Sequence, residues 1–588
     1  MKEAGSKEFW GSHWGFMLAT AGSAIGLGNI WKFPYITGMN GGGAFVLIYL
    51  LCVMMVGLPV MICELSLGRA TGCGPVGAFN RITPNKTIFV EMLGAFGLVV
   101  AFALGLFGVY GYAVIIALSS LTLLFCGWKT LGILCGVIVP VIIMSYYGVI
   151  GGWTLIYIVK AFSGGLAFTD PNGAKEVMEP ILQAPRSAWG VILGAQIAFM
   201  FAAGGILLCG VKKGIERWSK ILMPLLFILL LALLLRSVSL PNAIRGVRFF
   251  LSPDFSKLST EGVLLAMGHA FFTLSLAMGI TITFGSYLRK EESIVKSSFI
   301  VIALDTTAAL MAGLAIFPAV FAMGFEPGRG PSLTFEILPA AFNLIPGELS
   351  TLWNGLFFLM LFIAALTSSI SLMEPVISFG MEECRLSRKV SVVLTVILIT
   401  LLGVLSALSV ASWEHFPWIR DCLLGSFGSA GGSMFDMLDS VSSNWLLPIG
   451  GLGITIYVGW IWGTRHALKE IRKGMSSQID TNLFLLLAGL KGEQGYGDVK
   501  HIFTPASLWG IFVRWITPVL LFLTFLYSIG VIRLPASSAV PEVHRQQLQQ
   551  KAADSDSELI RPEARHMEPF HSERQEEPPL PARNISGS

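Results

Sequence analysis

The chain has 588 residues, of which 54% are hydrophobic and only 13% are charged, and its mean hydropathy is +0.72. A soluble domain carries about 25% charged residues, so the composition excludes an ordinary water-soluble globular protein. The net charge of +4 is small and no basic patch is interleaved with aromatic residues, which argues against a nucleic-acid partner.

Long uncharged runs between short charged clusters are typical of a multi-pass helical membrane protein. Each run is long enough for one bilayer crossing, which takes about 20 residues. The runs are continuously apolar rather than alternating, which argues against a β-barrel. We expect spans near 13–37, 43–67, 131–160, 187–210, 218–237, 262–287, 295–323, 350–380, 389–410, 435–463 and 505–531.

The stretch from Met92 to Trp128 contains no Asp, Glu, Lys or Arg. As one helix it would be about 55 Å long at 1.5 Å per residue, far more than a hydrocarbon core of about 30 Å. Glycines at 108 and 111 offer a turn near its middle. We therefore expect an inserted hydrophobic hairpin at 88–127, which gives 13 crossings, or 11 if the hairpin only dips into the membrane.

Lys and Arg cluster in alternate connecting segments, which predicts that those segments and the N-terminus are cytoplasmic. After residue 533 the composition changes to Gln, Glu, Pro, Ser and Arg with few aromatics. This composition predicts a disordered tail at 534–588.

The first span holds Ala21-Gly22-Ser23-Ala24-Ile25-Gly26-Leu27-Gly28-Asn29, with three glycines and polar residues at mid-membrane depth. Glycine costs about 1 kcal/mol per residue in a helix, so this sequence favours an interruption. An interruption frees backbone carbonyls that suit Na⁺ and N–H groups that suit a carboxylate. On glycine content alone, close helix packing through small residues remains the alternative.

A second span, 262–287, holds Phe271-Phe272-Thr273-Leu274-Ser275-Leu276-Ala277-Met278-Gly279, again polar and small at mid-depth. With the hairpin set aside, it lies five spans after the first interrupted span. Two interrupted helices at matching places in two halves indicate an inverted-repeat transporter.

Six motifs follow one another along the chain: Gly26-Leu27-Gly28-Asn29-Ile30-Trp31-Lys32-Phe33-Pro34-Tyr35, Gly41-Gly42-Gly43-Ala44-Phe45, Glu64-Leu65-Ser66-Leu67-Gly68-Arg69, Lys213-Gly214-Ile215-Glu216-Arg217, Phe271 to Leu276, and Leu366-Thr367-Ser368-Ser369. This ordered set resembles the neurotransmitter:sodium symporter family, in its bacterial branch of sodium-dependent amino acid transporters. The resemblance covers about residues 5–533 apart from the hairpin.

The resemblance implies an all-α integral membrane protein of the leucine-transporter-type fold, with two inverted five-helix repeats in which helices 1 and 6 are broken. It implies a cytoplasmic N-terminus at 1–12, a first repeat at 13–237 and a second repeat at 238–464. A cytoplasmic loop and the last transmembrane helix follow at 465–533. The expected location is the cell membrane, in bacteria the inner membrane.

The resemblance also implies two sodium sites built from oxygen atoms, which suit this hard cation. The first would use Ala24, Asn29, Thr273, Asp305 and the carboxylate of the cargo. The second would use Gly22, Ile25, Ala364, Thr367 and Ser368. Without the family motif, the last two hydroxyls would be interpreted as helix-packing groups.

The implied cargo is an amino acid held between the two interrupted helices. Its carboxylate would meet the N–H groups of Leu27 and Gly28 and the Tyr147 hydroxyl. Its ammonium would meet carbonyls near Ala24, Phe272 and Thr273, with Ser275 nearby. The side-chain pocket would be lined by Ser23, Ile143, Phe272, Met278, Ser371 and Leu372.

Two positions bear on cargo and ion. Monoamine-carrying relatives have Asp at the position of Gly26, so glycine here favours a cargo with its own carboxylate, and the uncharged pocket favours a neutral, apolar one. Chloride-dependent relatives have a neutral residue at the position of Asp305 and Ser at that of Ala309. A fixed carboxylate can replace the charge of chloride, so we expect chloride-independent transport.

The resemblance also maps two gates. The outer gate would pair Lys32 with Asp439, and the inner gate would pair Lys7 with Glu382, next to Trp10 and Tyr287. Lys32 stands where the family usually has Arg, so a bidentate fork is lost. His269 stands where many relatives have Gln; we expect a neutral, hydrogen-bonded histidine there, with pH sensitivity as the alternative.

Other interpretations of the sequence remain open. The same fold could carry an osmolyte or imino acid, or could serve as a non-transporting sensor. An enzyme is disfavoured because the sequence offers no His/Asp/Ser set, metal cluster or phosphate loop. Which amino acid is carried, and whether the chain forms an oligomer, do not follow from the residues.

Overall fold

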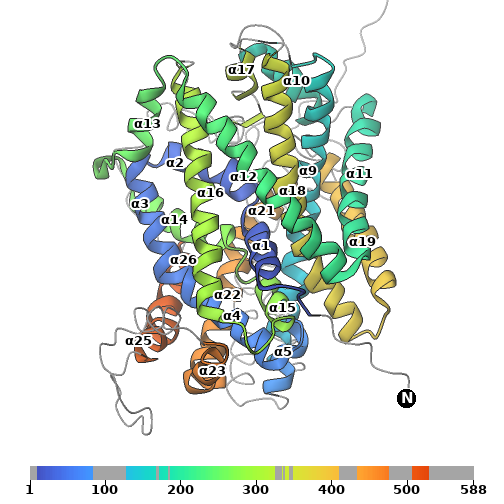
Figure 1. The fold of residues 1–588 in the computed structure, drawn as a ribbon, viewed down its shortest axis with the longest axis vertical. Coiled ribbons are helices and arrows are strands. Elements are labelled where there is room, and N and C mark those ends of the chain that lie inside the picture. The colour runs from blue at the N-terminus through green and yellow to red at the C-terminus, as the bar shows by residue number, and fades with distance from the viewer. Residues whose placement is uncertain are drawn as a thin grey trace, which may run out of the picture. The chain divides into compact units, whose positions relative to one another are not determined.

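A computed structural model describes residues 9–83, 127–166, 168, 171–182, 186–322, 324, 334–335, 338–343, 349–408, 434–475 and 506–528. These residues are almost entirely helical, and the part of the chain so described contains no strand beyond an isolated bridge between Gly42 and Pro253 (Figure 1). The predicted tail at 534–588 and, apart from Gly127, the predicted hairpin at 88–127 lie outside the described residues.

The first half of the described chain contains α1 (His13–Ala24), η1 (Gly28–Lys32), α2 (Phe33–Met39), α3 (Gly43–Cys52), η2 (Val53–Gly57), α4 (Leu58–Thr71), α5 (Pro75–Ile82), α8 (Lys129–Ile133), η3 (Leu134–Ile138), α9 (Val139–Phe162), α10 (Pro171–Leu182), η4 (Arg186–Ala188), α11 (Trp189–Leu208), η5 (Val211–Glu216) and α12 (Arg217–Val238).

The second half contains α13 (Ala243–Leu251), η6 (Phe255–Lys257), α14 (Thr260–Thr273), α15 (Ile280–Ser286), α16 (Ile294–Ala322), α17 (Leu338–Asn343), α18 (Leu349–Glu382), α19 (Arg388–Leu408), α21 (Met434–Ser440), η8 (Val441–Leu446), α22 (Leu447–Ile456), η9 (Tyr457–Gly463), α23 (Thr464–Ile471), α25 (Ala506–Ile511), η10 (Phe512–Ile516) and α26 (Thr517–Ser528).

Both predicted helix interruptions are confirmed. The first separates α1, which ends at Ala24, from η1, which begins at Gly28. The second separates α14, which ends at Thr273, from α15, which begins at Ile280. The second interruption contains backbone with positive φ, including +70° at Gly279, a conformation that a regular right-handed helix does not allow.

Nine further helices in the described residues are long and apolar enough to span a membrane. With the two interrupted helices they account for all eleven spans predicted outside 88–127. Some predicted ends are wrong, because charge marks the membrane surface without ending a helix. The helix predicted at 218–237 begins at Val211. The one predicted at 435–463 is interrupted at Gly463, whose φ is +86°, and α23 follows directly.

The bundle has an inner and an outer set of helices. α1 lies in its middle and contacts α12, α16 and α18 (Figure 1). The most apolar window of α18 is 83% buried, whereas that of the last span, Leu508–Ser528, is 33% buried. Outer helices expose large apolar side chains, such as Phe201 (69%), Leu235 (62%) and Leu401 (63%). Hydrocarbon tails accommodate such a surface and water does not.

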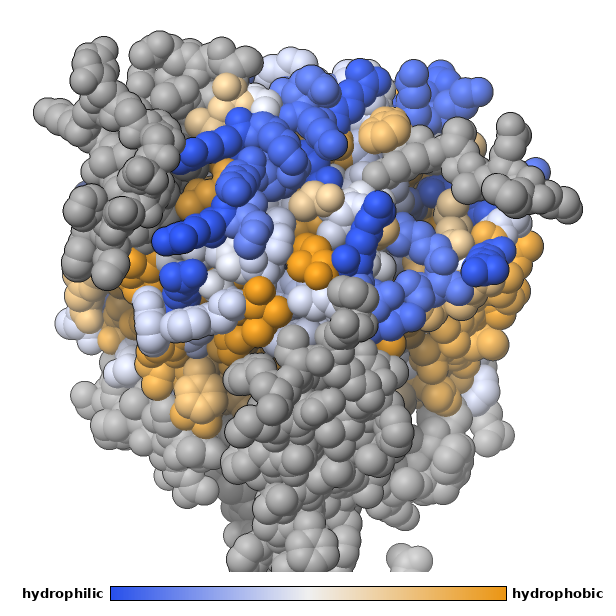
Figure 2. Space-filling model, turned by 90° about the horizontal axis from the view of Figure 1, so that it is seen from below, coloured by the Kyte–Doolittle hydropathy of each residue, from blue (hydrophilic) through white to orange (hydrophobic). Residues whose placement is uncertain are grey.

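The part of the surface that is coloured in Figure 2, seen from below, carries a broad hydrophilic area with hydrophobic residues on either side of it. α5 and α23 lie at this end of the bundle in Figure 1. A polar end and apolar sides are the pattern expected of a protein that spans a bilayer.

Glycines allow α4 and α15 to touch through their backbones. A Cβ at Gly68 would overlap the Ile282 carbonyl and would lie 2.9 Å from the Ser286 nitrogen. A Cβ at Gly285 would lie 3.0 Å from the Cα of Leu65. Small residues at helix crossings permit this approach, which fixes the second half of the interrupted sixth span against α4.

Gly68→Ala should therefore destabilise the protein, because the added methyl group has no room between two backbones. The expected loss is about 1–3 kcal/mol, as for other overpacked sites. The measurement is the thermal unfolding midpoint of the detergent-purified protein. Gly205→Ala is the control, because a Cβ there meets nothing within 4 Å. Equal midpoints for the two variants would contradict this account.

Candidate sodium and substrate site

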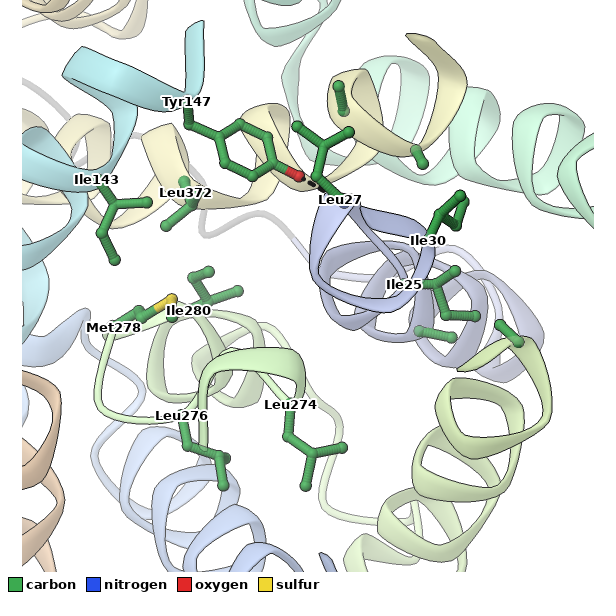
Figure 3. Packing of buried hydrophobic residues seen from close by; sticks show 14 of the residues in the cluster. Ile25, Leu27, Ile30, Ile143, Tyr147, Leu274, Leu276, Met278, Ile280 and Leu372 are labelled. Atoms are coloured by element: carbon green, nitrogen blue, oxygen red, sulfur yellow. Dashed lines mark hydrogen bonds between the residues drawn. The ribbon is translucent and has the colours of Figure 1, made fainter. Parts of the chain in front are cut away.

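The interruption of the first span directs its free backbone groups at two predicted side chains. The Leu27 N–H donates to the phenolic oxygen of Tyr147 at 3.1 Å (Figure 3). The Gly26 N–H donates to Oδ1 of Asn29 at 3.2 Å. Buried backbone groups in a membrane must be satisfied within the protein, and these bonds do so. An incoming carboxylate could take over the Leu27 N–H and accept from the Tyr147 hydroxyl.

Gly26 lies against two side chains from other helices. A Cβ at this position would overlap Oγ of Ser368 and would lie 2.7 Å from the phenolic oxygen of Tyr147. A side chain at position 26 would therefore displace one of these groups. The glycine keeps both hydroxyls beside the free backbone groups of the first interruption.

Asp305 receives hydrogen bonds from both interrupted helices. Its Oδ1 accepts from the Asn29 amide at 2.8 Å and from the Thr273 hydroxyl at 3.2 Å. Its Oδ2 accepts from the Tyr49 hydroxyl at 3.4 Å. Asp305 is completely buried, and all three partners donate, as an ionised carboxylate requires. The structure thus brings together three of the residues predicted for the first sodium site.

Two of the residues predicted for the second sodium site, Gly22 and Ser368, are in contact between α1 and α18. The Ser368 hydroxyl donates to the carbonyls of Gly22 (3.4 Å) and Ser23 (3.1 Å). The Thr367 hydroxyl donates to the Ala364 carbonyl at 3.2 Å, within its own helix. Hydroxyl and carbonyl oxygens suit Na⁺. No group of three or more His, Cys, Asp or Glu that could hold a metal ion occurs in the described part of the chain.

The second interruption is held by a residue that the sequence analysis did not assign to the site. Glu64 of α4 is fully buried, and its Oε1 accepts from the Ala277 N–H at 2.7 Å. Its Oε2 accepts from the Thr281 hydroxyl. Ala277 has φ of +60°, which non-glycine residues adopt only at a cost. The signal for Glu64 was present, since a carboxylate inside a span is functional by default.

Four of the residues predicted to line the pocket lie near the two interruptions. Figure 3 shows Tyr147, Ile143 and Leu372 on one side and Met278 opposite. These four side chains are at most 4% exposed. The remaining predicted members take other contacts: Ser275 donates to the Ser23 carbonyl at 2.9 Å, Ser371 donates to the Thr367 carbonyl at 3.0 Å, and Phe272 lies 3.3 Å from where a Cβ at Gly28 would be.

The pair predicted for the outer gate, Lys32 and Asp439, lies beside Phe272, one of the predicted pocket residues. Lys32 Nζ is 3.2 Å from Oδ1 and Oδ2 of Asp439, and it lies 4.6 Å from the centre of the Phe272 ring. Asp439 Oδ1 also accepts from the Tyr146 hydroxyl at 3.0 Å and from the Ser443 hydroxyl at 3.1 Å. Sequence reasoning did not assign these last two residues.

The inner side is held by aromatic and acidic groups. The Trp10 indole donates to the Phe284 carbonyl at 3.1 Å, and its ring packs edge-on against Tyr287 at 6.2 Å. The Tyr287 hydroxyl donates to Glu374 at 2.9 Å. Glu382 accepts from the Gly74 N–H at 2.9 Å. Lys7, its predicted partner, lies outside the described residues.

The expectation of a hydrogen-bonded His269 is wrong. Neither ring nitrogen has a hydrogen-bond partner among the described residues. The ring instead stacks on Phe33, with 5.7 Å between ring centres, and packs at 5.6 Å from Tyr49. Aromatic stacking was invisible in the sequence because it joins three separate helices.

Comparison with known proteins identifies the family. The profile of the sodium:neurotransmitter symporter family matches residues 7–132 and 180–488. The chain belongs to this family. It is 34% identical over 524 residues to YhdH of Bacillus subtilis, named an uncharacterized sodium-dependent transporter, covering 89% of this chain and 98% of that one. A second uncharacterized sodium-dependent transporter, from Haemophilus influenzae, is 34% identical over 483 residues, covering 80% of this chain and 92% of that one.

A solved structure supports the same assignment. The crystal structure of MhsT in complex with L-phenylalanine matches with a TM-score of 0.69 and 35% identity, covering 89% of this chain and all of that one. The family relatives are transporters and not enzymes. This chain is therefore a multi-pass, sodium-dependent symporter for a small molecule, with the leucine-transporter-type fold.

Glu64→Gln should weaken Na⁺-dependent substrate binding roughly 10- to 100-fold, the effect of losing one hydrogen bond to a charged group. Glu64 accepts from the Ala277 N–H and from the Thr281 hydroxyl. The Gln amide has only one acceptor oxygen, so the bond to Thr281 would have to reverse and both bonds would lose the carboxylate charge. The measurement is equilibrium binding at several Na⁺ concentrations. The control is Glu383→Gln, whose carboxylate pairs with Lys129 elsewhere. Unchanged binding by Glu64→Gln would contradict the role given to this residue.

Proposed function

We propose that the protein couples inward movement of Na⁺ to uptake of a neutral, apolar amino acid by alternating access, without a need for chloride. The observation that carries this proposal is the glycine at position 26, packed against Tyr147 and Ser368. A side chain there would fill the place of a carboxylate. Its absence leaves the Leu27 N–H and the Tyr147 hydroxyl available to a cargo that brings its own carboxylate.

The first sodium ion would bind where the cargo carboxylate meets the Asp305 cluster. The Asn29 amide nitrogen and the Thr273 hydroxyl contact the Asp305 carboxylate, while Oδ1 of Asn29 lies on the side of the first interruption, where it accepts from the Gly26 N–H. Oδ1 of Asn29, the Thr273 hydroxyl and the carbonyl of Ala24, the last residue of α1, would be the protein's other oxygen ligands. A sodium ion there would be shared by protein and cargo. Each would then stabilise binding of the other, which is the physical basis of coupling.

The second sodium ion would join α1 to α18. Ser368 already bridges these helices through the carbonyls of Gly22 and Ser23, and Thr367 lies one residue earlier on α18. Ile25 and Ala364 would supply further carbonyls. An ion at this position would hold the inner half of the first span in place, and its release would free that half.

The pocket favours an uncharged cargo side chain. Ile143, Met278 and Leu372 contribute apolar surface, and no described member of the predicted pocket is ionisable. A charged side chain placed there without a partner would cost several kcal/mol, roughly the transfer cost of a buried polar group or more. The L-phenylalanine in the MhsT complex is a cargo of the proposed kind.

Two gates would close alternately on the outer and inner sides. Lys32 is 14% exposed and Asp439 is 34% exposed, so this pair is partly wet and contributes only about 0–1 kcal/mol. Trp10, Tyr287 and the pair of Glu382 with Lys7 would close the inner side. Weak gates suit this function because neither state is locked. The N-terminus and the inner gate would face the cytoplasm of a bacterial cell.

Gly26→Asp should abolish uptake of carboxylated cargo, because the new carboxylate would occupy the cargo carboxylate's place and repel it. The measurement is uptake into proteoliposomes driven by a Na⁺ gradient, with labelled phenylalanine, leucine, lysine, glutamate and phenethylamine. The native protein should accumulate only the first two. Accumulation of phenethylamine by the native protein would contradict the proposal. So would accumulation of a carboxylated osmolyte, tested separately, when none of the five panel compounds accumulates.

Replacing chloride with gluconate should leave uptake by the native protein unchanged, because Asp305 supplies the fixed negative charge. Asp305→Asn should lose uptake in gluconate and regain part of it when chloride is added. The measurement is the initial rate of uptake in each anion. Native uptake that collapses in gluconate would show that Asp305 does not replace chloride.

A further inference from the structure

The carboxylate of Glu216, on the fifth span, accepts hydrogen bonds from residues at the start of the first span. Glu216, the last residue of η5, is 3% exposed. Its Oε2 accepts from the Gly11 N–H at 2.6 Å, and its Oε1 accepts from the Ser12 hydroxyl at 2.9 Å. Ser12 is also the N-cap of α1, since its Oγ accepts from the Gly15 N–H at 3.0 Å. The Gly11 N–H is therefore bonded directly to Glu216, and the Gly15 N–H is linked to it through the Ser12 hydroxyl.

The fit between the two helices is close. A Cβ at Gly15 would overlap Cγ, Cδ and Oε1 of Glu216, and a Cβ at Gly11 would lie 3.0 Å from its Oε2. Two glycines thus make room for the carboxylate. A negative charge at a helix N-terminus is also favoured by the helix dipole. Lys220 Nζ, 2.6 Å from Oε1, compensates the charge from the exposed side.

The residues on either side of Gly11 and Ser12 contact other parts of the chain. Trp10 is held by Phe284 at the end of the sixth span, and His13 is paired with Glu292 before α16. Neither contact involves the fifth span. Breaking the Glu216 contacts would free Gly11 and Ser12 from η5, while the Trp10 and His13 contacts and the packing of α1 on α12 remain.

We propose that Glu216 is a latch of the inner gate, acting as a positioning residue that holds the inner half of the first span closed. This inference rests on the alternating access of the proposed function. When the latch opens, Gly11 and Ser12 leave the carboxylate and α1 separates from η5. Glu216 then keeps its ion pair with Lys220, so opening does not leave an unpaired buried charge.

The test is hydrogen–deuterium exchange of the purified full-length protein in Na⁺ and in K⁺, read by mass spectrometry. In K⁺, Glu216→Gln should speed exchange within 13–24 about tenfold, the effect of losing a hydrogen bond to a charged group. Exchange within α19 should not change. Saturating Na⁺ and cargo should reduce the difference, because both would bind the closed first span.

For Gly15→Ala, the latch and helix propensity predict opposite changes in the rate of hydrogen exchange within α1. Alanine favours a helix by about 1 kcal/mol over glycine, so propensity alone would slow exchange within α1. The latch predicts faster exchange, because the methyl group pushes Glu216 away. Gly194→Ala is the matched control, since a Cβ there meets nothing within 4 Å.

Three results would overturn the latch. They are unchanged exchange within 13–24 in Glu216→Gln, slower exchange in Gly15→Ala, and equal acceleration in α1 and α19, which would show general destabilisation. Na⁺-dependent cargo binding by the native protein is measured in parallel. If the native protein binds cargo in a Na⁺-dependent way but one of these three results is found, only the latch inference is wrong. If that binding is absent, the proposed function itself fails.

Discussion

The carboxylate of Asp305 is the interaction on which the centre of this protein depends. It accepts from Asn29 in the first interrupted span and from Thr273 in the second, so it joins the two spans directly beside their interruptions. A buried carboxylate is costly unless its oxygens are satisfied. The Tyr49 hydroxyl adds a third donor. Without this acid, two polar interruptions at mid-membrane depth would face each other without a common partner.

A second buried carboxylate, that of Glu64, also satisfies polar groups at an interruption. Glu64 satisfies the backbone of the sixth span at Ala277, where positive φ takes the chain out of a helix. Gly68, four residues later on α4, allows the helix to touch the backbone of α15. One face of α4 therefore both accepts from the interruption and supports the helix that follows it.

The two interruptions could be predicted from the sequence because glycine weakens a helix and a polar residue at mid-membrane depth needs a partner. Asn29, Thr273 and Asp305 were predicted through family motifs, and the structure brings all three together. Tyr49 and Glu216 were not assigned a role. Their partners lie more than 200 positions away along the chain, and such contacts leave no local periodicity in the sequence.

Helix ends were predicted less well than helices. Charged residues at the membrane surface were taken as ends, yet α12 continues η5 with helical backbone at the junction, Glu216. Charge reports the depth of a residue in the bilayer, whereas a helix ends only where its backbone hydrogen bonds end. The stacking of His269 could not be predicted either, because its aromatic neighbours Phe33 and Tyr49 come from other helices.

The most direct test of the central claim is equilibrium binding of ²²Na⁺ to the purified protein, with and without saturating L-phenylalanine. If the cargo carboxylate completes a sodium site beside Asp305, cargo should increase the amount of bound sodium at low Na⁺ concentration. Asn29→Ala should remove that increase, whereas Thr367→Ala should weaken sodium binding but keep the increase. Sodium binding that is the same with and without cargo in the native protein would contradict a sodium ion shared with the cargo.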